Sequence, residues 1–202
     1  MQGMIKNPLS KKLEGYQIIL ASGSPRRKAF LEELGIPYTV HVKPVDEVYP
    51  PELKGAEISD YLAVLKASAF KNQIETNQIV LTSDTVVWCY DESLAKAADE
   101  EEATQMLNKL SGQWHEVITS VCFTTLSEQK VVHSKTKVKL KTLTAAEIGY
   151  YINTFKPYDK AGAYGIQEWI GSIGIEEIRG SYNTVVGLPT HLVYKTLMDM
   201  AD

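Results

Sequence analysis

The chain has 202 residues, of which 44% are hydrophobic and 23% are charged, and its 21 basic and 25 acidic side chains give a formal net charge of −4. This balance is typical of a folded globular protein and excludes an intrinsically disordered chain. The mild acidity argues against a nucleic-acid polymer as partner, since such binding needs a basic face. It is compatible with a small phosphorylated ligand, which needs only a local cluster of positive charge.

The apolar runs are too short to span a bilayer, and the longest of them are Tyr61–Leu65 and Val86–Tyr90. The lysines near the N-terminus are followed by no apolar segment, so we expect neither a signal peptide nor a membrane partner. Cys89 and Cys122 are far apart and fit no Cys-x-x-Cys pattern. This usage favours buried thiols in a cytoplasmic protein over a secreted disulfide scaffold.

The first elements follow in quick succession. Residues 1–16 are predicted to be a short polar lead-in, and residues 17–202 a single α/β domain. Gln17–Ala21 is an apolar run bounded by turn-forming residues, which predicts a buried strand. A helix is expected to begin at Ser24-Pro25, with serine as the N-cap and proline at the first helical position, and to end at Gly35.

Two further strands and a helix are predicted before residue 90. Tyr38–Lys43 is expected to be a strand. The next helix carries Lys66, and its apolar positions share one face: Ile58, Tyr61, Leu62, Leu65 and Ala69. Ile79–Ser83 is predicted to be a buried strand that ends at Asp84, and Val86–Tyr90 continues the apolar pattern.

The rest of the chain alternates less regularly. The remaining predicted elements are a helix from Asp99 to Ser111, strands over His115–Leu126 and Val131–Leu140, a helix opened by the capping box of Thr144 and Glu147 and ended at Lys156, and a last helix opened by Pro189. Helices alternate with strands early, whereas strands adjoin in the middle. This order predicts an α/β fold with a mixed sheet flanked by helices, and two lobes with a cleft between them fit it.

The helix start at Ser24 is the first candidate site. Arg26 and Arg27 lie in its first turn, where their positive charge opposes the helix dipole. A bound phosphate would resolve this conflict, because it accepts hydrogen bonds from the free amides and from the guanidinium groups together. The alternative is a capped surface helix with both arginines in solvent, and these residues alone favour neither interpretation.

Asp84 is the second candidate, because a carboxylate beside a buried strand is costly unless it is paired, binds a metal or takes part in chemistry. Ligands of α/β proteins bind at strand ends, where this side chain is expected. A structural role, hydrogen bonding to a neighbouring turn, is equally compatible. The third candidate is Asp159–Gln167, whose small residues let the backbone approach a ligand, although a tight structural turn that carries Lys160 is the simpler interpretation.

Other charged and polar residues give weaker indications of a site. Glu47 lies in an acidic loop that could supply a carboxylate to a divalent ion, and Lys66 and Lys96 taken alone are ordinary surface lysines. His115, at the head of a strand, is more often structural than catalytic. The sequence has no zinc-ligand spacing, no Walker A loop, no Gly-x-Gly-x-x-Gly fingerprint and no Gly-x-Ser-x-Gly elbow.

Taken together and in this order, the segments resemble the Maf family of nucleotide pyrophosphatases. The matching pieces are Leu20–Arg27, Ser83–Val87, Leu110–His115, Asp159–Gln167, Gly180–Tyr182 and Val185–Pro189. The resemblance covers most of the chain from Gln17 onward. It implies a cytoplasmic, metal-dependent enzyme, using Mg²⁺ or Mn²⁺, that splits a nucleoside triphosphate into a monophosphate and pyrophosphate.

Carried over position by position, the resemblance makes Asp84 the catalytic acid–base residue. It associates Arg26, Thr85 and Gln167 with nucleotide selectivity, and the similar subgroup with these residues prefers dTTP and UTP. The other expected substrate contacts are Ser24, Arg27, Lys66, Lys96 and Lys160, and Glu47 is expected to hold the metal together with Asp84.

The chain departs from the family pattern at two places. Lys96 is followed by Ala97, where the family usually has proline, which loosens the loop that holds this lysine. Glu168 stands where the family commonly has glycine, and its charge beside Gln167 bears on nucleotide selection. Two other functions remain open: a non-catalytic nucleotide-binding regulator of cell division, and a sugar phosphatase that would release orthophosphate. The assembly also remains open, with a homodimer as one alternative.

Overall fold

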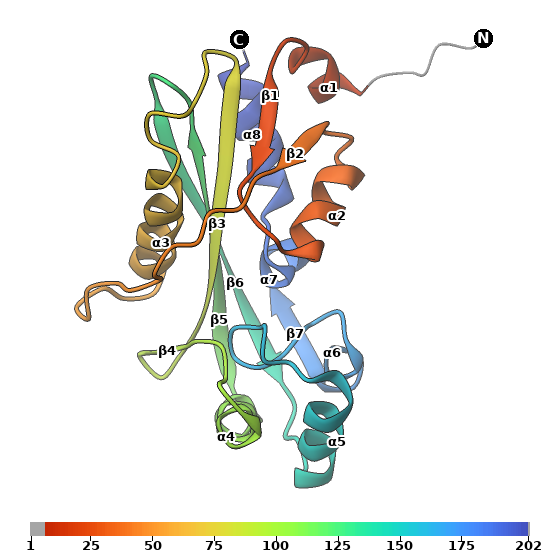
Figure 1. The fold of residues 1–202 in the computed structure, drawn as a ribbon. Helices are drawn as coiled ribbons and strands as arrows, with labels where there is room; N and C mark the ends of the chain where they lie inside the picture. The colour runs from red at the N-terminus through yellow and green to blue at the C-terminus, as the bar shows by residue number, and fades with distance from the viewer. Residues whose placement is uncertain (1–6, 202) are drawn as a thin grey trace.

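The computed structural model describes residues 7–201 (Figure 1). Its elements are, in chain order, α1 Pro8–Lys12, β1 Gln17–Leu20, α2 Pro25–Glu33, β2 Tyr38–Val40, α3 Ala56–Ser68, β3 Gln78–Cys89, β4 Glu92–Leu94, α4 Glu100–Leu110, β5 Trp114–Thr124, β6 Gln129–Leu140, α5 Ala145–Phe155, α6 Trp169–Gly174, β7 Ile175–Arg179, α7 Tyr182–Val186 and α8 Thr190–Met200. Residues 1–6 of the expected lead-in lie outside the described residues. Its later part contains α1, whose Leu9 is fully buried.

The strands form one seven-stranded mixed sheet in the order β2-β1-β3-β5-β6-β7, with β4 paired to β3. β1 runs parallel to both β2 and β3. The other pairs, β3 with β4 and β5, β5 with β6, and β6 with β7, are antiparallel. The predicted class, an α/β fold with a mixed sheet flanked by helices, is therefore confirmed.

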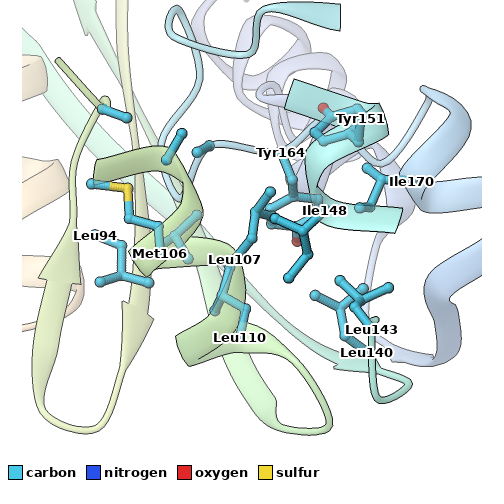
Figure 2. Packing of buried hydrophobic residues seen from close by; sticks show 14 of the residues in the cluster. Leu94, Met106, Leu107, Leu110, Leu140, Leu143, Ile148, Tyr151, Tyr164 and Ile170 are labelled. Atoms are coloured by element: carbon cyan, nitrogen blue, oxygen red, sulfur yellow. The ribbon is translucent and has the colours of Figure 1, made fainter. Parts of the chain in front are cut away.

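The long strands β3, β5 and β6 run through two lobes, each with its own core (Figure 1). In one lobe, α1, α2 and α8 pack against β1 and the first half of β3, while α3 packs on the other side of the sheet against β3, β5 and β6. In the other lobe, α4, α5 and α6 enclose the core shown in Figure 2. The boundary between the two cores crosses β3 near its middle.

Asp84 lies inside β3, which corrects the prediction that the buried strand Ile79–Ser83 ends at Asp84 before the apolar pattern continues as Val86–Tyr90. Parallel pairing of β3 with β1 ends at Leu81, but its antiparallel ladder with β5 continues from Val80 to Trp88. Because β5 supplies backbone hydrogen bonds throughout, polar side chains do not terminate the strand. Asp84 therefore lies just beyond the carboxyl end of β1, so it still lies beside a strand end.

Smaller differences concern short elements. β2 is shorter than predicted, and Tyr61 of α3 is 39% exposed and not part of the packed face. The short elements β4, α6, β7 and α7 had no prediction. Cys89 and Cys122 are buried free thiols, as expected. Over residues 7–201, no helix has the length and apolar character needed to cross a membrane.

Candidate active site

A cavity of about 870 Å³ lies where the two lobes meet. Every residue that the sequence nominated for the site contributes to its lining: Ser24, Arg26, Arg27, Glu47, Lys66, Asp84, Thr85, Lys96, Lys160 and Gln167. They come from the start of α2, the loop before α3, α3 itself, the middle of β3, the segment after β4 and the loop before α6. The fold thus gathers segments that are up to about 140 residues apart.

Lys66 lies between two carboxylates. Ile58 and Leu62 are buried on the face of α3 that packs on the sheet, and Lys66 follows at the same four-residue spacing, so its side chain is directed toward β3. Its ammonium nitrogen is 2.6 Å from Asp84 Oδ1 and 3.0 Å from Glu47 Oε2. The Asp84 side chain is only 10% exposed, so Lys66 supplies the counter-charge that its burial requires.

Arg27 is half-buried and joins several segments through hydrogen bonds. Its Nε donates to the Gly187 carbonyl at 2.9 Å, and its terminal nitrogens donate to the Ser22 hydroxyl, the Ser83 carbonyl and the Thr85 hydroxyl at 3.2, 3.0 and 3.3 Å. Burial lowers the pKa of Arg27, and the nearby Asp84 carboxylate opposes this effect. These bonds tie α2 to β3 and to the segment after α7.

Arg26, the residue before Arg27 in the same turn, points elsewhere. Its guanidinium is 3.2 Å from Asp159 Oδ2 and remains 26% exposed. Ser24 caps the helix as predicted, since its hydroxyl accepts from the Arg27 amide. The Arg26–Asp159 ion pair joins α2 of one lobe to the loop of the other lobe across the cavity. Arg26 is therefore the arginine that a bound anion can engage.

Lys160 is held by two carboxylates on the far wall. Its ammonium is 2.7 Å from Asp159 Oδ1 and 3.0 Å from Glu168 Oε1, and its side chain is 10% exposed. Burial raises the pKa of the Asp159 carboxyl, but the hydrogen bonds from Lys160 and Arg26 outweigh it and lower that pKa overall. Glu168 is thus neutralised by Lys160 and does not present an unpaired charge beside Gln167.

Thr85 and Lys96 are two further residues of the predicted set. The Thr85 hydroxyl is 3.0 Å from that of Thr119 on β5, in addition to its bond from Arg27. Lys96 is exposed, and its backbone forms an isolated bridge with Ala161. Ala97 is buried in the core of its lobe. The backbone bridge and the buried Ala97 therefore hold the segment around Lys96 in place without a proline.

Ser83 was not nominated from the sequence, whereas Tyr164 belongs to the third candidate segment, Asp159–Gln167. Ser83 lies beside Asp84 and lines the cavity, and its hydroxyl is buried with no partner among the described residues. Tyr164, which also lines the cavity, is 2.7 Å from the Nε2 of His115. Burial lowers the pKa of His115 to about 4, so this histidine is neutral and structural, as expected. A serine next to a candidate acid was the only signal in the sequence for Ser83.

The family model for Maf-like proteins matches residues 17–200. The chain belongs to this family. It is 55% identical over 95% of its length, and 98% of the relative's, to a dTTP/UTP pyrophosphatase of Christiangramia forsetii. It is 50% identical, over 94% of its length and 97% of the relative's, to a dTTP/UTP pyrophosphatase of Flavobacterium johnsoniae. A solved nucleoside-triphosphatase, a dITP/XTP pyrophosphatase of Mycobacterium abscessus, matches with TM-score 0.43 and 14% identity, covering 91% of this chain and 95% of that one.

The carboxylates of this Maf-like protein fit a hard divalent cation that also binds substrate. Asp84 and Glu47 converge on one cation, the Lys66 ammonium, which shows that their oxygens can share a positive charge. Within residues 7–201 no group of three or more His, Cys, Asp or Glu side chains gathers as a metal cage. One or two carboxylates completed by phosphate oxygens and water is the usual way in which proteins hold Mg²⁺.

Proposed function

We propose that this protein hydrolyses dTTP and UTP to the nucleoside monophosphate and pyrophosphate. The observation that carries the proposal is the buried Asp84 carboxylate, held by Lys66 in a cavity that Arg26 and Lys96 also line. A carboxylate among cations is the arrangement that hydrolysis of a polyphosphate requires, since the base must sit beside charges that bind the anion. The relatives named dTTP/UTP pyrophosphatase support the same substrates.

In the proposed reaction, the Asp84 carboxylate accepts a proton from the attacking water. The water oxygen forms a bond to the α-phosphorus, and the bond from that phosphorus to the oxygen shared with the β-phosphate breaks, releasing pyrophosphate. Lys66 orients Asp84 through its bond to Oδ1, and Oδ2 has no hydrogen bond within the described residues. Arg26 and Lys96 are proposed to neutralise the triphosphate, and the amides that follow Ser24 to donate hydrogen bonds to it.

A divalent cation, Mg²⁺ or Mn²⁺, is proposed as cofactor, held by Asp84 and Glu47. When bound, it neutralises phosphate oxygens and makes the attacking water more acidic. Gln167, exposed at the cavity, is proposed to contact the pyrimidine edge, because its amide both donates and accepts hydrogen bonds. Thr85 is proposed to support this selectivity from the opposite wall.

The proposal is tested by incubating the purified protein with dTTP, UTP, CTP, GTP and ATP, with Mg²⁺ or Mn²⁺ and with EDTA, and identifying the products. We expect pyrophosphate and monophosphate from dTTP and UTP, abolished by EDTA. Binding without turnover would support a nucleotide-sensing regulator instead, and orthophosphate from sugar phosphates would support a phosphatase. Preference for purine nucleotides would contradict the proposed role of Gln167.

A cytoplasmic location and a homodimer are also proposed. Buried free thiols suit a reducing compartment. Light scattering on the purified protein measures its mass in solution, and a monomer would contradict the dimer.

A further inference from the structure

Gln167 is the exposed end of an otherwise buried loop. Residues 162–166 are all buried, whereas Gln167 is exposed and lines the cavity. Its side-chain amide has no hydrogen bond within residues 7–201, so the backbone that carries it decides where the amide lies. The Gly165 N–H donates to the hydroxyl of Tyr151 on α5 at 3.0 Å. This bond fixes the loop two residues before Gln167.

Glu168 fixes the same loop on the other side of Gln167. The hydroxyl that accepts from Gly165 also donates to Glu168 Oε2. Burial and the Glu168 carboxylate raise the pKa of Tyr151, so this hydroxyl stays protonated and remains a donor. A single hydroxyl, on the fully buried Tyr151 shown in Figure 2, therefore clamps residues 165 and 168 and brackets Gln167.

The second oxygen of Glu168 engages Lys160. This ammonium lies between Glu168 Oε1 and Asp159 Oδ1, and Asp159 also pairs with Arg26. The formal charges of these four side chains cancel, because two cations face two carboxylates. The ion pair packs directly on the loop: a Cβ added to Gly165 would lie 2.9 Å from Glu168 Cδ and 3.0 Å from Lys160 Cε.

We infer that Glu168 and Lys160 are positioning residues that hold Gln167 for recognition of the pyrimidine edge, and that Lys160 does not contact the triphosphate. The inference rests on the proposed function and deepens it. An amide held in one orientation matches the 4-oxo and N3–H groups of uracil, whereas cytosine presents the opposite pattern. A loop that moves lets the amide rotate and accept cytosine. Selectivity, more than turnover, therefore depends on the Glu168–Lys160 pair.

The test compares kcat and KM for UTP and CTP, which share a ribose and a triphosphate and differ only at the base. Glu168→Gln removes the charge and keeps the shape, and Lys160→Met removes the ammonium. Gly165→Ala leaves both charges in place but displaces the pair, because its new methyl group would meet the ends of two flexible side chains. Glu116→Gln is the matched control, since Glu116 pairs with Lys135 at 2.9 Å outside the cavity.

We expect each of the first three variants to lower the UTP-to-CTP ratio of kcat/KM by about tenfold, the scale of one lost charge-assisted hydrogen bond. The kcat for UTP should change by less than about threefold, because the general base is untouched. The double variant Glu168→Gln, Lys160→Met should lose no more selectivity than either single variant, since both remove one interaction. Glu116→Gln should keep the wild-type ratio.

Two results would overturn the inference. An unchanged ratio in folded Glu168→Gln or Gly165→Ala would show that the pair does not position Gln167. A rise in KM for both nucleotides by the same factor in Lys160→Met, with the ratio unchanged, would make Lys160 a triphosphate contact. Thermal melting verifies folding, and if one variant does not fold, the other two decide. A wild-type protein that hydrolyses no nucleotide would refute the proposed function itself, and this result differs from a change in the UTP-to-CTP ratio of the variants.

Discussion

Replacing Asp84 with asparagine should separate catalysis from substrate binding. Asparagine keeps the shape of the side chain but cannot take a proton from water. Loss of a general base costs about two to four orders of magnitude in rate, which corresponds to about 3 to 5 kcal/mol in the activation barrier. We therefore expect kcat for dTTP to fall by that factor.

The structure also sets the sign of the effect on binding and stability. Asp84 is the nearer counter-charge of Lys66, at 2.6 Å against 3.0 Å for Glu47, and its charge also acts on Arg27. Asparagine leaves these two cations with Glu47 alone, so the local charge rises by one. Removing one partner of a buried pair costs about 3 to 5 kcal/mol, and because Glu47 remains we expect a smaller loss of about 2 kcal/mol. The added positive charge favours the triphosphate, whereas the loss of one proposed metal ligand opposes its binding, so at saturating Mg²⁺ the KM for dTTP should change much less than kcat.

The assay measures kcat and KM for dTTP by pyrophosphate release, with urea denaturation as the measure of stability. Glu116→Gln, which removes a carboxylate outside the cavity, is the control for a general change in charge. Turnover of folded Asp84→Asn within about threefold of wild type, far below the cost of a lost general base, would refute the assignment. A large rise in KM with unchanged kcat would make Asp84 a binding residue.

Two further predictions concern stability. Arg27→Lys cannot reproduce the four hydrogen bonds of the guanidinium. It should lower the free energy of unfolding, measured by urea denaturation, by about 3 kcal/mol. A loss no larger than that caused by Arg179→Lys, at an exposed arginine, would contradict this. The folded pKa of His115, about 4, lies below its ordinary value of 6.5, so the unfolded chain binds the proton first as the pH falls. Stability should therefore decrease from pH 6.5 to pH 4, by about 3 kcal/mol in total. His115→Gln should lack this part of the pH dependence, and identical melting temperature profiles over this range would refute the argument.

Local chemistry made much of the fold predictable. The Ser24-Pro25 start of α2 and the capping box of Thr144 depend on residues within one turn of a helix, and both are present. The short elements β4, α6, β7 and α7 carry too few residues for a periodic pattern. Their positions depend on pairing with distant strands, such as β7 against β6.

The position of Asp84 inside β3 also depends on pairing with a distant strand, and the local sequence did not predict it. Polar residues after an apolar run are typical of a strand end, but the antiparallel partner β5 extends β3 beyond it. The contacts of Glu168 were equally hidden. Its charge beside Gln167 indicated an effect on nucleotide selection, whereas in the structure Lys160 and Tyr151 each bind one of its two oxygens.

The sequence by itself identified the segments that form the site: a capped helix start, an acid after a buried strand and a small-residue loop, in a slightly acidic chain. Only the tertiary structure decided which contacts each residue of these segments makes. Arg26 and Arg27 are adjacent, yet one braces the buried centre and the other faces Asp159 across the cavity. The physical reason is that successive residues of a helix point about 100° apart, so what each one meets depends on segments far away in the chain.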